Sequence, residues 1–304
     1  MTCYGPVTAY YAAAINSNGK RSLVFDKRKA HSGIALKVPC GRCHGCRLDR
    51  SSRWALRCMH ERRLHKQSSF LTLTYNNQNL PADGTLLKRD LQLFMKRLRK
   101  ADSMPVVMVD GININSIRFF ACGEYGDENN RPHYHVLLFN RDFDDRKFYK
   151  KSKAGENLYT SKKVEELWPI GFNTVGDVSY ESCAYVARYV LKKMQGPKAD
   201  DHYAGREQEF VLMSRRPGIG SAWFDKYHEQ AYAHDNTVVD GREMPLPRYY
   251  DDKYEKIQAA HLFYLKLIRR KRALERRADS TRARLRVRET VAIAKSRIYK
   301  RNLE

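Results

Sequence analysis

Residues 131–139 read Arg131-Pro132-His133-Tyr134-His135-Val136-Leu137-Leu138-Phe139, which predicts a strand that carries two histidines into an apolar core. Successive side chains of an extended chain point to opposite faces. His133 and His135 therefore project to one side, while Tyr134 faces the other layer. Two imidazoles on a rigid strand can bind a divalent cation and leave coordination positions open for a substrate oxygen. The plain alternative is a pair of histidines on a wet strand face.

The segments around this stretch predict an α+β fold, with a mostly antiparallel central sheet and flanking helices. We expect strands at residues 69–75, 116–123, 133–140 and 172–178, and helices at 48–66, 161–168, 179–194 and from a cap at Thr85. The polar connection at 124–132 should join two strands as a hairpin. No Gly or Pro follows Pro247, so the last fifty residues should form one long basic helix. We therefore divide the chain into an N-terminal segment (1–66), a core (67–235) and a linker with a basic helical tail (236–304).

The chain is strongly basic, with 57 Lys and Arg against 34 Asp and Glu and a formal net charge of +23. Such a protein usually binds a polyanion; nucleic acid is the first expectation and anionic lipid the alternative. Residues 251–304 hold 17 basic and 7 acidic side chains, so the tail alone does not explain the surplus. No apolar run approaches the length of a membrane span and no signal peptide is evident, which predicts no membrane partner.

Seven cysteines, three of them in the run Cys40-x-x-Cys43-x-x-Cys46, indicate bound metal in a reducing compartment and not a disulfide framework. The spacing favours a structural Zn²⁺ site, which needs four ligands. The fourth could be Cys3 or Cys58, and His44 is a poorer choice. An iron–sulfur cluster uses the same spacing, and a loop of free thiols is the plain alternative.

Tyr185 and Tyr189 lie one turn apart in an expected helix. At about 100° per residue they share a side with Arg188 and Lys192, opposite the apolar residues Cys183, Ala187, Val190 and Met194. A tyrosine pair in a basic setting suits attack on a phosphodiester, which forms a covalent phosphotyrosine. A metal ion at the histidines would stabilise the charge that develops on the phosphate.

A third metal ligand should be a carboxylate if the ion is Mg²⁺ or Mn²⁺. Glu124 ends the strand before the histidines and is the first choice, with Asp127 and Glu128 as alternatives; Glu124 could equally be a plain turn residue. Contacts to nucleic-acid phosphates are expected from a helix stripe, from the tyrosine helix and from the turn at 213–220. These residues are Arg47, Arg50, Arg53 and Arg57, then Arg188, Lys192 and Lys193, then Arg215 and Arg216 with the free backbone amides of their turn.

Three stretches in this order, LTLTY at 71–75, HYH at 133–135 and YVARY at 185–189, resemble the motifs of HUH endonucleases that start rolling-circle replication. The chain is similar to the replication initiation proteins of gokushovirus-type microviruses, small single-stranded DNA phages of bacteria. The likeness includes Cys3, the cysteine run with RLDR at 47–50, and MSRRPGIG at 213–220, and it covers most of residues 1–230. Tyr134 departs from the aliphatic residue common in the histidine motif, and it should still pack behind the sheet.

The resemblance implies an HUH nuclease fold that nicks single-stranded or melted origin DNA, leaving a 5′-phosphotyrosine link and a free 3′-OH, and later rejoins the strand. It assigns His133 and His135 as metal ligands, Tyr185 and Tyr189 as nucleophiles, and Glu124 by a looser match. It implies the cytoplasm of a bacterial host and, since no Walker A sequence is present, a partner helicase within the host replication machinery. Two other functions remain: a noncatalytic, zinc-stabilised nucleic-acid-binding protein, and a transposase or relaxase with the same chemistry.

Overall fold

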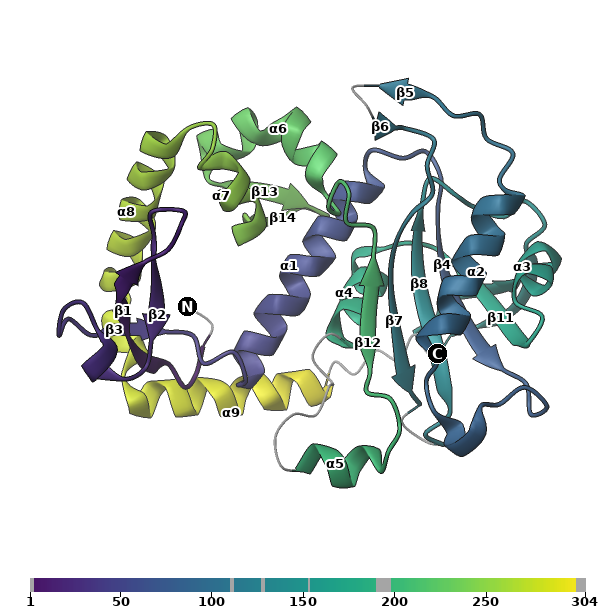
Figure 1. The fold of residues 1–304 in the computed structure, drawn as a ribbon, viewed down its shortest axis with the longest axis horizontal. Coiled ribbons are helices and arrows are strands. Elements are labelled where there is room, and N and C mark those ends of the chain that lie inside the picture. The colour runs from purple at the N-terminus through teal and green to yellow at the C-terminus, as the bar shows by residue number, and fades with distance from the viewer. Residues whose placement is uncertain (1–2, 110–111, 127–128, 153, 190–197, 299–304) are drawn as a thin grey trace. The chain divides into compact units, whose positions relative to one another are not determined.

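The computed structural model describes residues 3–109, 112–126, 129–152, 154–189 and 198–298 (Figure 1). The chain divides into a large compact unit of residues 51–262 and a small one formed by residues 1–50 together with 263–300. Within the described ranges, none of the helices is both long and apolar enough to cross a membrane.

The large unit is built on a seven-stranded sheet in the order β12-β7-β8-β4-β11-β10-β9, in which every neighbouring pair is antiparallel. Its strands are β4 (Ser68–Tyr75), β7 (Arg118–Tyr125), β8 (Pro132–Phe139), β9 (Lys147–Lys151), β10 (Asn157–Thr160), β11 (Gly171–Gly176) and β12 (Phe210–Met213). The expected α+β class and antiparallel sheet are confirmed. The expected hairpin is β7–β8, in which Glu124 pairs with His133 and Cys122 with His135.

Helices and two short ribbons complete this unit. The helices are α1 (His44–Arg62, which begins in the small unit), α2 (Lys88–Ala101), α3 (Lys162–Leu167), α4 (Tyr180–Tyr189), α5 (Lys198–Tyr203), α6 (Ser221–His234) and α7 (Arg248–Tyr254). The ribbons pair β5 (Met108–Val109) with β6 (Ile112–Asn113) and β13 (Asn236–Val239) with β14 (Arg242–Pro245).

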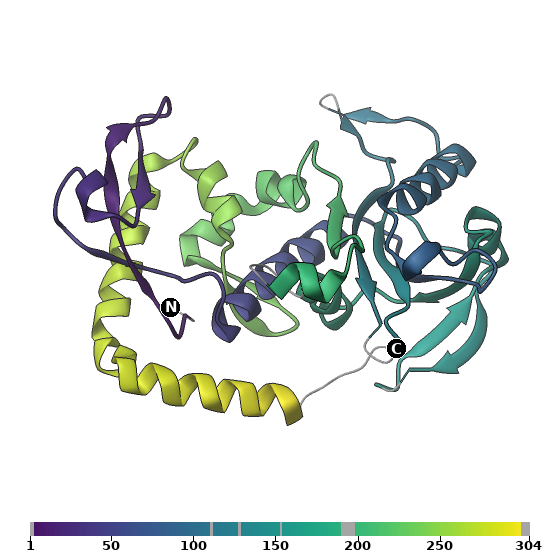
Figure 2. The same cartoon turned by 60° about the horizontal axis from the view of Figure 1, so that its bottom comes forward.

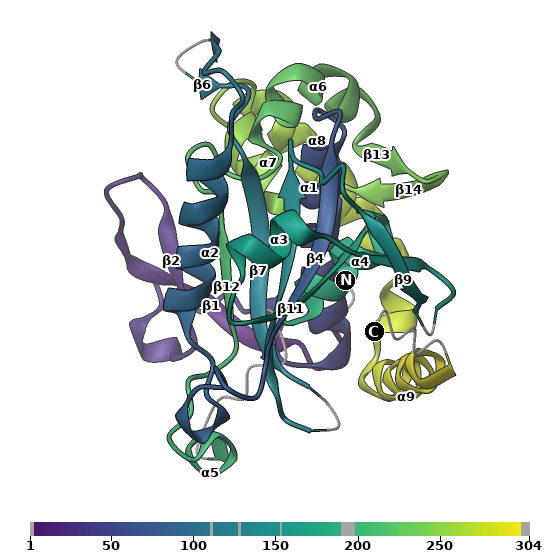
Figure 3. The same cartoon turned by 90° about the vertical axis from the view of Figure 1, so that its right-hand side faces the viewer.

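The alternation along β8 sorts its side chains between two cores. Tyr134, Val136 and Leu138 lie in the core that also contains the apolar residues of α2 and α3, the face seen in Figure 3. Leu137 and Phe139 lie in the second core, together with residues of α1 and α4. The sheet is therefore covered by helices on both faces, and the two histidines project toward the side of α1 and α4.

Tyr134 packs behind the sheet, as predicted. It is fully buried, its Oη accepts a hydrogen bond from the Leu87 amide at 2.9 Å, and it lies 2.7 Å from the Tyr75 hydroxyl. Burial raises the pKa of Tyr134 to about 12, so the phenol stays neutral. The cap predicted at Thr85 is wrong: α2 begins at Lys88 without a side-chain cap, and the Thr85 hydroxyl accepts the Glu207 amide instead.

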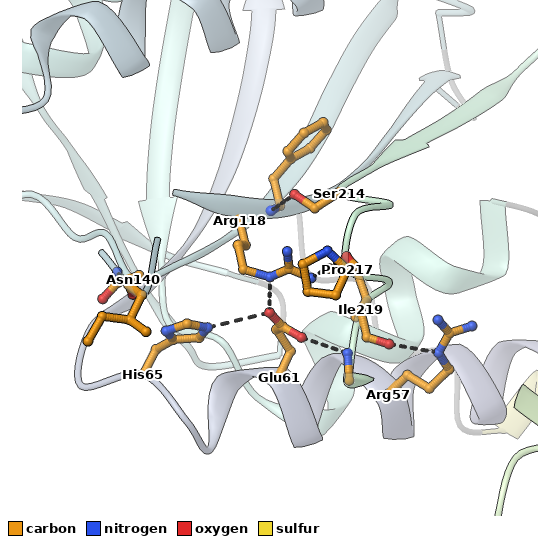
Figure 4. A network of polar contacts seen from close by, with 11 residues as sticks. Arg57, Glu61, His65, Arg118, Asn140, Ser214, Pro217 and Ile219 are labelled. Atoms are coloured by element: carbon orange, nitrogen blue, oxygen red, sulfur yellow. Dashed lines mark hydrogen bonds and ion pairs between the residues drawn. The ribbon is translucent and has the colours of Figure 1, made fainter. Parts of the chain in front are cut away.

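Arg57 does not belong to a phosphate-contacting stripe, contrary to the prediction. Its guanidinium lies between the rings of Trp54 and Tyr249, 4.1 and 3.7 Å from their centroids, and donates to the Ile219 carbonyl (Figure 4). Helical periodicity placed Arg57 beside exposed arginines, but aromatic packing and a backbone acceptor decided its position. It is a structural residue.

A buried carboxylate next to Arg57 secures the turn that follows β12. Glu61 is 2% exposed, pairs with Arg118 and accepts the Gly220 amide, while Arg118 also donates to the Pro217 carbonyl (Figure 4). Gly220 has φ +77°, and a Cβ there would lie 2.4 Å from the Tyr250 hydroxyl, so only glycine is accommodated. The expected strand–turn segment at 213–220 is thus fixed from within the large unit.

The small unit combines a three-stranded sheet with the basic end of the chain. Its strands, in the order β2-β1-β3, are β1 (Val7–Ile15), β2 (Arg21–Val24) and β3 (Leu36–Val38), and they lie alongside α8 (Ala259–Glu275) (Figures 1 and 2). Residues 1–50 and 263–300 hold 23 Lys and Arg against 5 Asp and Glu, so this unit carries +18 of the +23 net charge.

The single long C-terminal helix that we predicted is wrong. The chain forms α8 and α9 (Arg282–Ile298), separated by a 3₁₀ turn at Arg277–Ser280. Thr281 has an extended backbone, its carbonyl accepts the Leu285 amide and its hydroxyl the Arg284 amide. Asp, Ser and Thr side chains compete for backbone groups and favour helix starts, so the run Asp279-Ser280-Thr281 breaks the helix without Gly or Pro.

Candidate metal and nucleophile site

The β7–β8 hairpin brings Glu124, His133 and His135 together. The Nε2 atoms of both histidines lie 2.8 Å from Glu124 Oε1, and all three side chains are 6% exposed or less. The pairing of Glu124 with His133 puts these two side chains on the same face, and His135 follows two residues along the same strand. The candidate triad from the sequence is therefore assembled by one hairpin. The alternatives Asp127 and Glu128 lie outside the described residues.

Neighbouring groups orient both imidazoles. His133 Nδ1 lies 3.1 Å from the Arg131 carbonyl, so it must carry the proton that this oxygen accepts, and Nε2 is left with its lone pair. His135 Nδ1 lies 3.0 Å from the Thr72 hydroxyl, and the ring stacks on Phe70 at 5.5 Å. Such contacts to the distal nitrogen are the usual way in which proteins fix a metal-binding histidine.

The donor set fits a small divalent cation. Octahedral Mg²⁺ or Mn²⁺ with ligands at about 2.1 Å has neighbouring ligand atoms about 3.0 Å apart, close to the nitrogen–oxygen distances found here. Burial would raise the pKa of the Glu124 carboxyl, but hydrogen bonds from His133 and His135 outweigh it and the pKa is lowered. Glu124 is therefore an anion, as a metal ligand must be.

Helix α4 places Tyr185 against this triad. Its ring meets the His135 ring edge to face, with centroids 5.1 Å apart, and the side chain is 8% exposed. Ser179 caps the helix, accepting the Ser182 amide at 3.2 Å, as predicted. The Ser51 hydroxyl of α1 donates to the Ala184 carbonyl at 3.0 Å. These contacts hold α4 over the face that carries the metal ligands.

The other predicted residues of the tyrosine helix are only partly described. Arg188 is exposed, with its guanidinium carbon 5.7 Å from the centre of the Tyr185 ring. Tyr189 is the last described residue of α4, and its side chain is not described. Lys192, Lys193 and the predicted helix end at Met194 lie outside the described residues. The predicted division of faces is wrong for Tyr185, which is buried beside Val186 and Ala187 because it packs on the histidines.

A second tyrosine pair with the same spacing has a different environment. Tyr250 is fully buried, and Tyr254 stacks on Tyr232 at 3.7 Å with its hydroxyl 2.8 Å from His261 Nδ1. Burial raises the pKa of both phenols. This pair belongs to the packing of α6, α7 and α8.

Cys3, Cys40, Cys43 and Cys46 form a second candidate metal site, in the small unit. Their sulfur atoms lie within 4.8 Å of one another, with Cys40–Cys46 at 4.0 Å and Cys3–Cys43 at 3.9 Å. Backbone amides donate to three of the sulfurs, those of Cys3, Cys40 and Cys43. The structure thus brings Cys3 to the run. Cys58 lies elsewhere, in the large unit's second core beside Cys183.

The remaining predicted contacts to nucleic acid are surface residues. Arg47, Arg50 and Arg53 are exposed on α1, and Arg215 and Arg216 are exposed after β12. The amides of this turn are not free, as we had expected, because Ser214 donates to the Phe119 carbonyl and Gly220 to Glu61. Only its arginine side chains are available for phosphates.

Comparison with known proteins places this geometry in a family. A family model described as replication-associated protein ORF2 matches residues 68–194, which include the triad and Tyr185. Replication-associated protein VP4 of Bdellovibrio phage phiMH2K is 34% identical over 84% of this chain and 78% of its own length. Replication-associated protein ORF2 of Spiroplasma virus 4 is 33% identical over 77% and 72%. The chain belongs to the family of phage replication-associated proteins. No solved structure gives a significant match.

Membership in the replication-associated proteins confirms the family expected from the three motifs. Sequence reasoning missed two supporting groups of this replication-associated protein, the Thr72 hydroxyl and the Arg131 carbonyl. Thr72 lies in the LTLTY stretch, and strand alternation could have placed it on the histidine face, since it pairs with His135. A backbone carbonyl carries no sequence signal.

Proposed function

We propose that this protein initiates rolling-circle replication by nicking single-stranded or locally melted origin DNA through an HUH-type transesterification. The observation that carries the proposal is the Tyr185 ring at 5.1 Å from the ring of His135, whose Nε2 shares Glu124 Oε1 with His133. Nucleophilic catalysis requires such proximity between an attacking hydroxyl and the group that stabilises the developing charge.

The residues divide the reaction among themselves. Glu124, His133 and His135 would hold Mg²⁺ or Mn²⁺, which supplies charge stabilisation at a non-bridging phosphate oxygen. Tyr185 Oη would form a bond to phosphorus while the bond from phosphorus to the 3′ oxygen breaks. The phenol loses its proton and the leaving oxygen gains one, giving a 5′-phosphotyrosine and a 3′-OH. Tyr189 is the candidate second nucleophile for strand rejoining.

DNA contacts and partners follow from charge and family. Arg188 beside Tyr185, together with Lys192 and Lys193, would contact phosphates near the site. The exposed arginines Arg47, Arg50, Arg215 and Arg216 would contact the strand elsewhere. The protein would act in the cytoplasm of a bacterial host and rely on a host helicase and the host replication machinery.

The cysteine site would hold a structural Zn²⁺. A tetrahedron with Zn–S bonds of about 2.3 Å has edges of about 3.8 Å, which agrees with the sulfur separations of 3.9 and 4.0 Å. An iron–sulfur cluster would hold its cysteines further apart, because bridging sulfides separate several iron atoms. The four-cysteine set therefore favours a single ion.

The test is formation of a covalent adduct. The protein is incubated with Mn²⁺ and labelled single-stranded fragments that tile the genome encoding it, and products are separated on a denaturing gel. We expect a protein-bound label with one fragment and none after chelation. Tyr185→Phe should remove the adduct or strand rejoining, whereas Tyr180→Phe, on the same helix with its hydroxyl bonded to Ser52, should retain both.

Absence of an adduct with every fragment would reject the nuclease and favour a noncatalytic binding protein. Joining of two DNA ends in place of one defined nick would favour a transposase. Mass spectrometry of the labelled peptide after one turnover identifies the attacking tyrosine.

A further inference from the structure

We propose that Phe172 and three threonines beside the metal ligands form a binding shelf for single-stranded DNA. Phe172 would stack on a base that flanks the phosphate held at the triad. The inference rests on the proposed function, because the DNA on the shelf is the strand to be nicked.

The register of four strands builds the shelf. Phe172 on β11 pairs with Thr74 on β4, Thr74 pairs with His133 on β8, and His133 pairs with Glu124 on β7. Paired residues of antiparallel strands place their side chains on the same face, so these four form one row across the sheet. Neighbouring strands are about 4.8 Å apart, which puts Phe172 about 10 Å from His133. A base next to a phosphate at the triad can reach this distance.

A second row runs beside the first. Thr174 on β11 pairs with Thr72, and Thr72 pairs with His135. Thr72, Thr74 and Thr174 are half-buried, whereas both histidines are buried. Hydroxyl groups are common donors to phosphate and sugar oxygens. Threonines therefore continue from the triad toward Phe172 on one partly open face.

Phe172 is held in an exposed position. It is 67% exposed in a strand that has neighbours on both sides. A Cβ on Gly171 would lie 1.7 Å from the Thr74 carbonyl oxygen, so only glycine permits this approach of β11 to β4. That close contact fixes Phe172 opposite Thr74. An aromatic ring presented in this way stacks on any base and tolerates changes of sequence.

The same sheet provides a matched control. Phe148 on β9 is 61% exposed, a value close to that of Phe172. It pairs with Tyr159, and Tyr159 pairs with Val175, which belongs to the core on the opposite face. Replacing Phe148 removes an equally exposed ring of the same sheet on the side away from the triad.

The experiment measures DNA binding separately from cleavage. Fluorescein-labelled oligothymidylate is titrated with protein in the presence of chelator, and Kd is read from anisotropy. We expect Phe172→Ala to raise Kd roughly 5- to 150-fold, the value of one base stacked on an aromatic ring. Phe172→Trp should restore binding, and Phe148→Ala should stay within about twofold of the wild type. Thermal melts verify that the variants fold.

A second readout locates the base. Oligothymidylate with one 5-iodouracil is irradiated on the protein, and the cross-linked peptide is sequenced by mass spectrometry; we expect the link at Phe172. An unchanged Kd for Phe172→Ala, or an equal loss for Phe148→Ala, rejects the shelf even if covalent adducts form. Loss of binding in Phe172→Ala without any adduct from the wild type keeps the shelf and rejects the nuclease.

Discussion

Glu61→Gln should destabilise the large unit strongly, although Glu61 is remote in sequence from the catalytic motifs. The change keeps the shape of the side chain but removes the charge opposite Arg118, which is 9% exposed. Breaking a buried ion pair typically costs 3–5 kcal/mol. Arg118 keeps the Pro217 carbonyl at 2.8 Å as an acceptor, so we expect the lower end, about 3 kcal/mol. For a unit of this size that lowers Tm by roughly 6–12 °C.

The assay is urea unfolding, with Glu207→Gln as the matched control. Glu207 pairs with Lys88, but both side chains are nearly half exposed, so its loss should cost under about 1 kcal/mol. Burial would raise the pKa of Glu61, but His65, Arg118 and the Gly220 amide together lower it. The stabilisation is therefore present above the ordinary glutamate pKa of about 4.3 and lost as pH falls below it. A Glu61→Gln variant as stable as Glu207→Gln at neutral pH would refute the reasoning.

Three further outcomes are expected. Purified protein should contain one Zn²⁺ per chain by metal analysis, and Cys43→Ser should lose it together with thermal stability; metal-free wild type with unchanged stability contradicts the site. Mn²⁺ should support adduct formation at lower concentration than Mg²⁺, because two of the three ligands are imidazoles; the opposite order argues against His133 and His135 as ligands. Burial, with a smaller effect of Arg63, lowers the pKa of His60 to about 3, whereas an unfolded histidine has about 6.5. Its stabilisation is thus full above pH 6.5 and lost toward pH 3 at about 1.4 kcal/mol per pH unit, and unfolding at pH 7, 6 and 5 should show a slope that His60→Gln lacks.

The sheet and the triad could be predicted because their signals are local. Alternation along residues 131–139 fixed which side chains face the metal and which face the core, and the short spacing from Glu124 to His133 confined the third ligand to one hairpin. Tyr185 was found through a motif, yet its burial against His135 could not be read from helix periodicity. Tertiary packing on the sheet determined which side of α4 is covered.

The parts that sequence reasoning missed depend on distant contacts. The edge strand β12 has four residues and gains its place only by pairing with β7. The position of Arg57 depends on Trp54 and Tyr249, and Tyr249 is far away in the chain. Phe172 carries no motif; its significance emerges only when the register of β11, β4 and β8 is known.

The small unit has a consequence for synthesis, because its two segments come from positions more than two hundred residues apart. A ribosome releases residues 51–262 before residues 263–300, and domains generally fold as units while the chain emerges. The sheet that carries the triad can thus fold before residues 263–300 exist. The surface with most of the positive charge is completed afterwards, so a nascent chain has its reactive centre before it has its strongest attraction for polyanions.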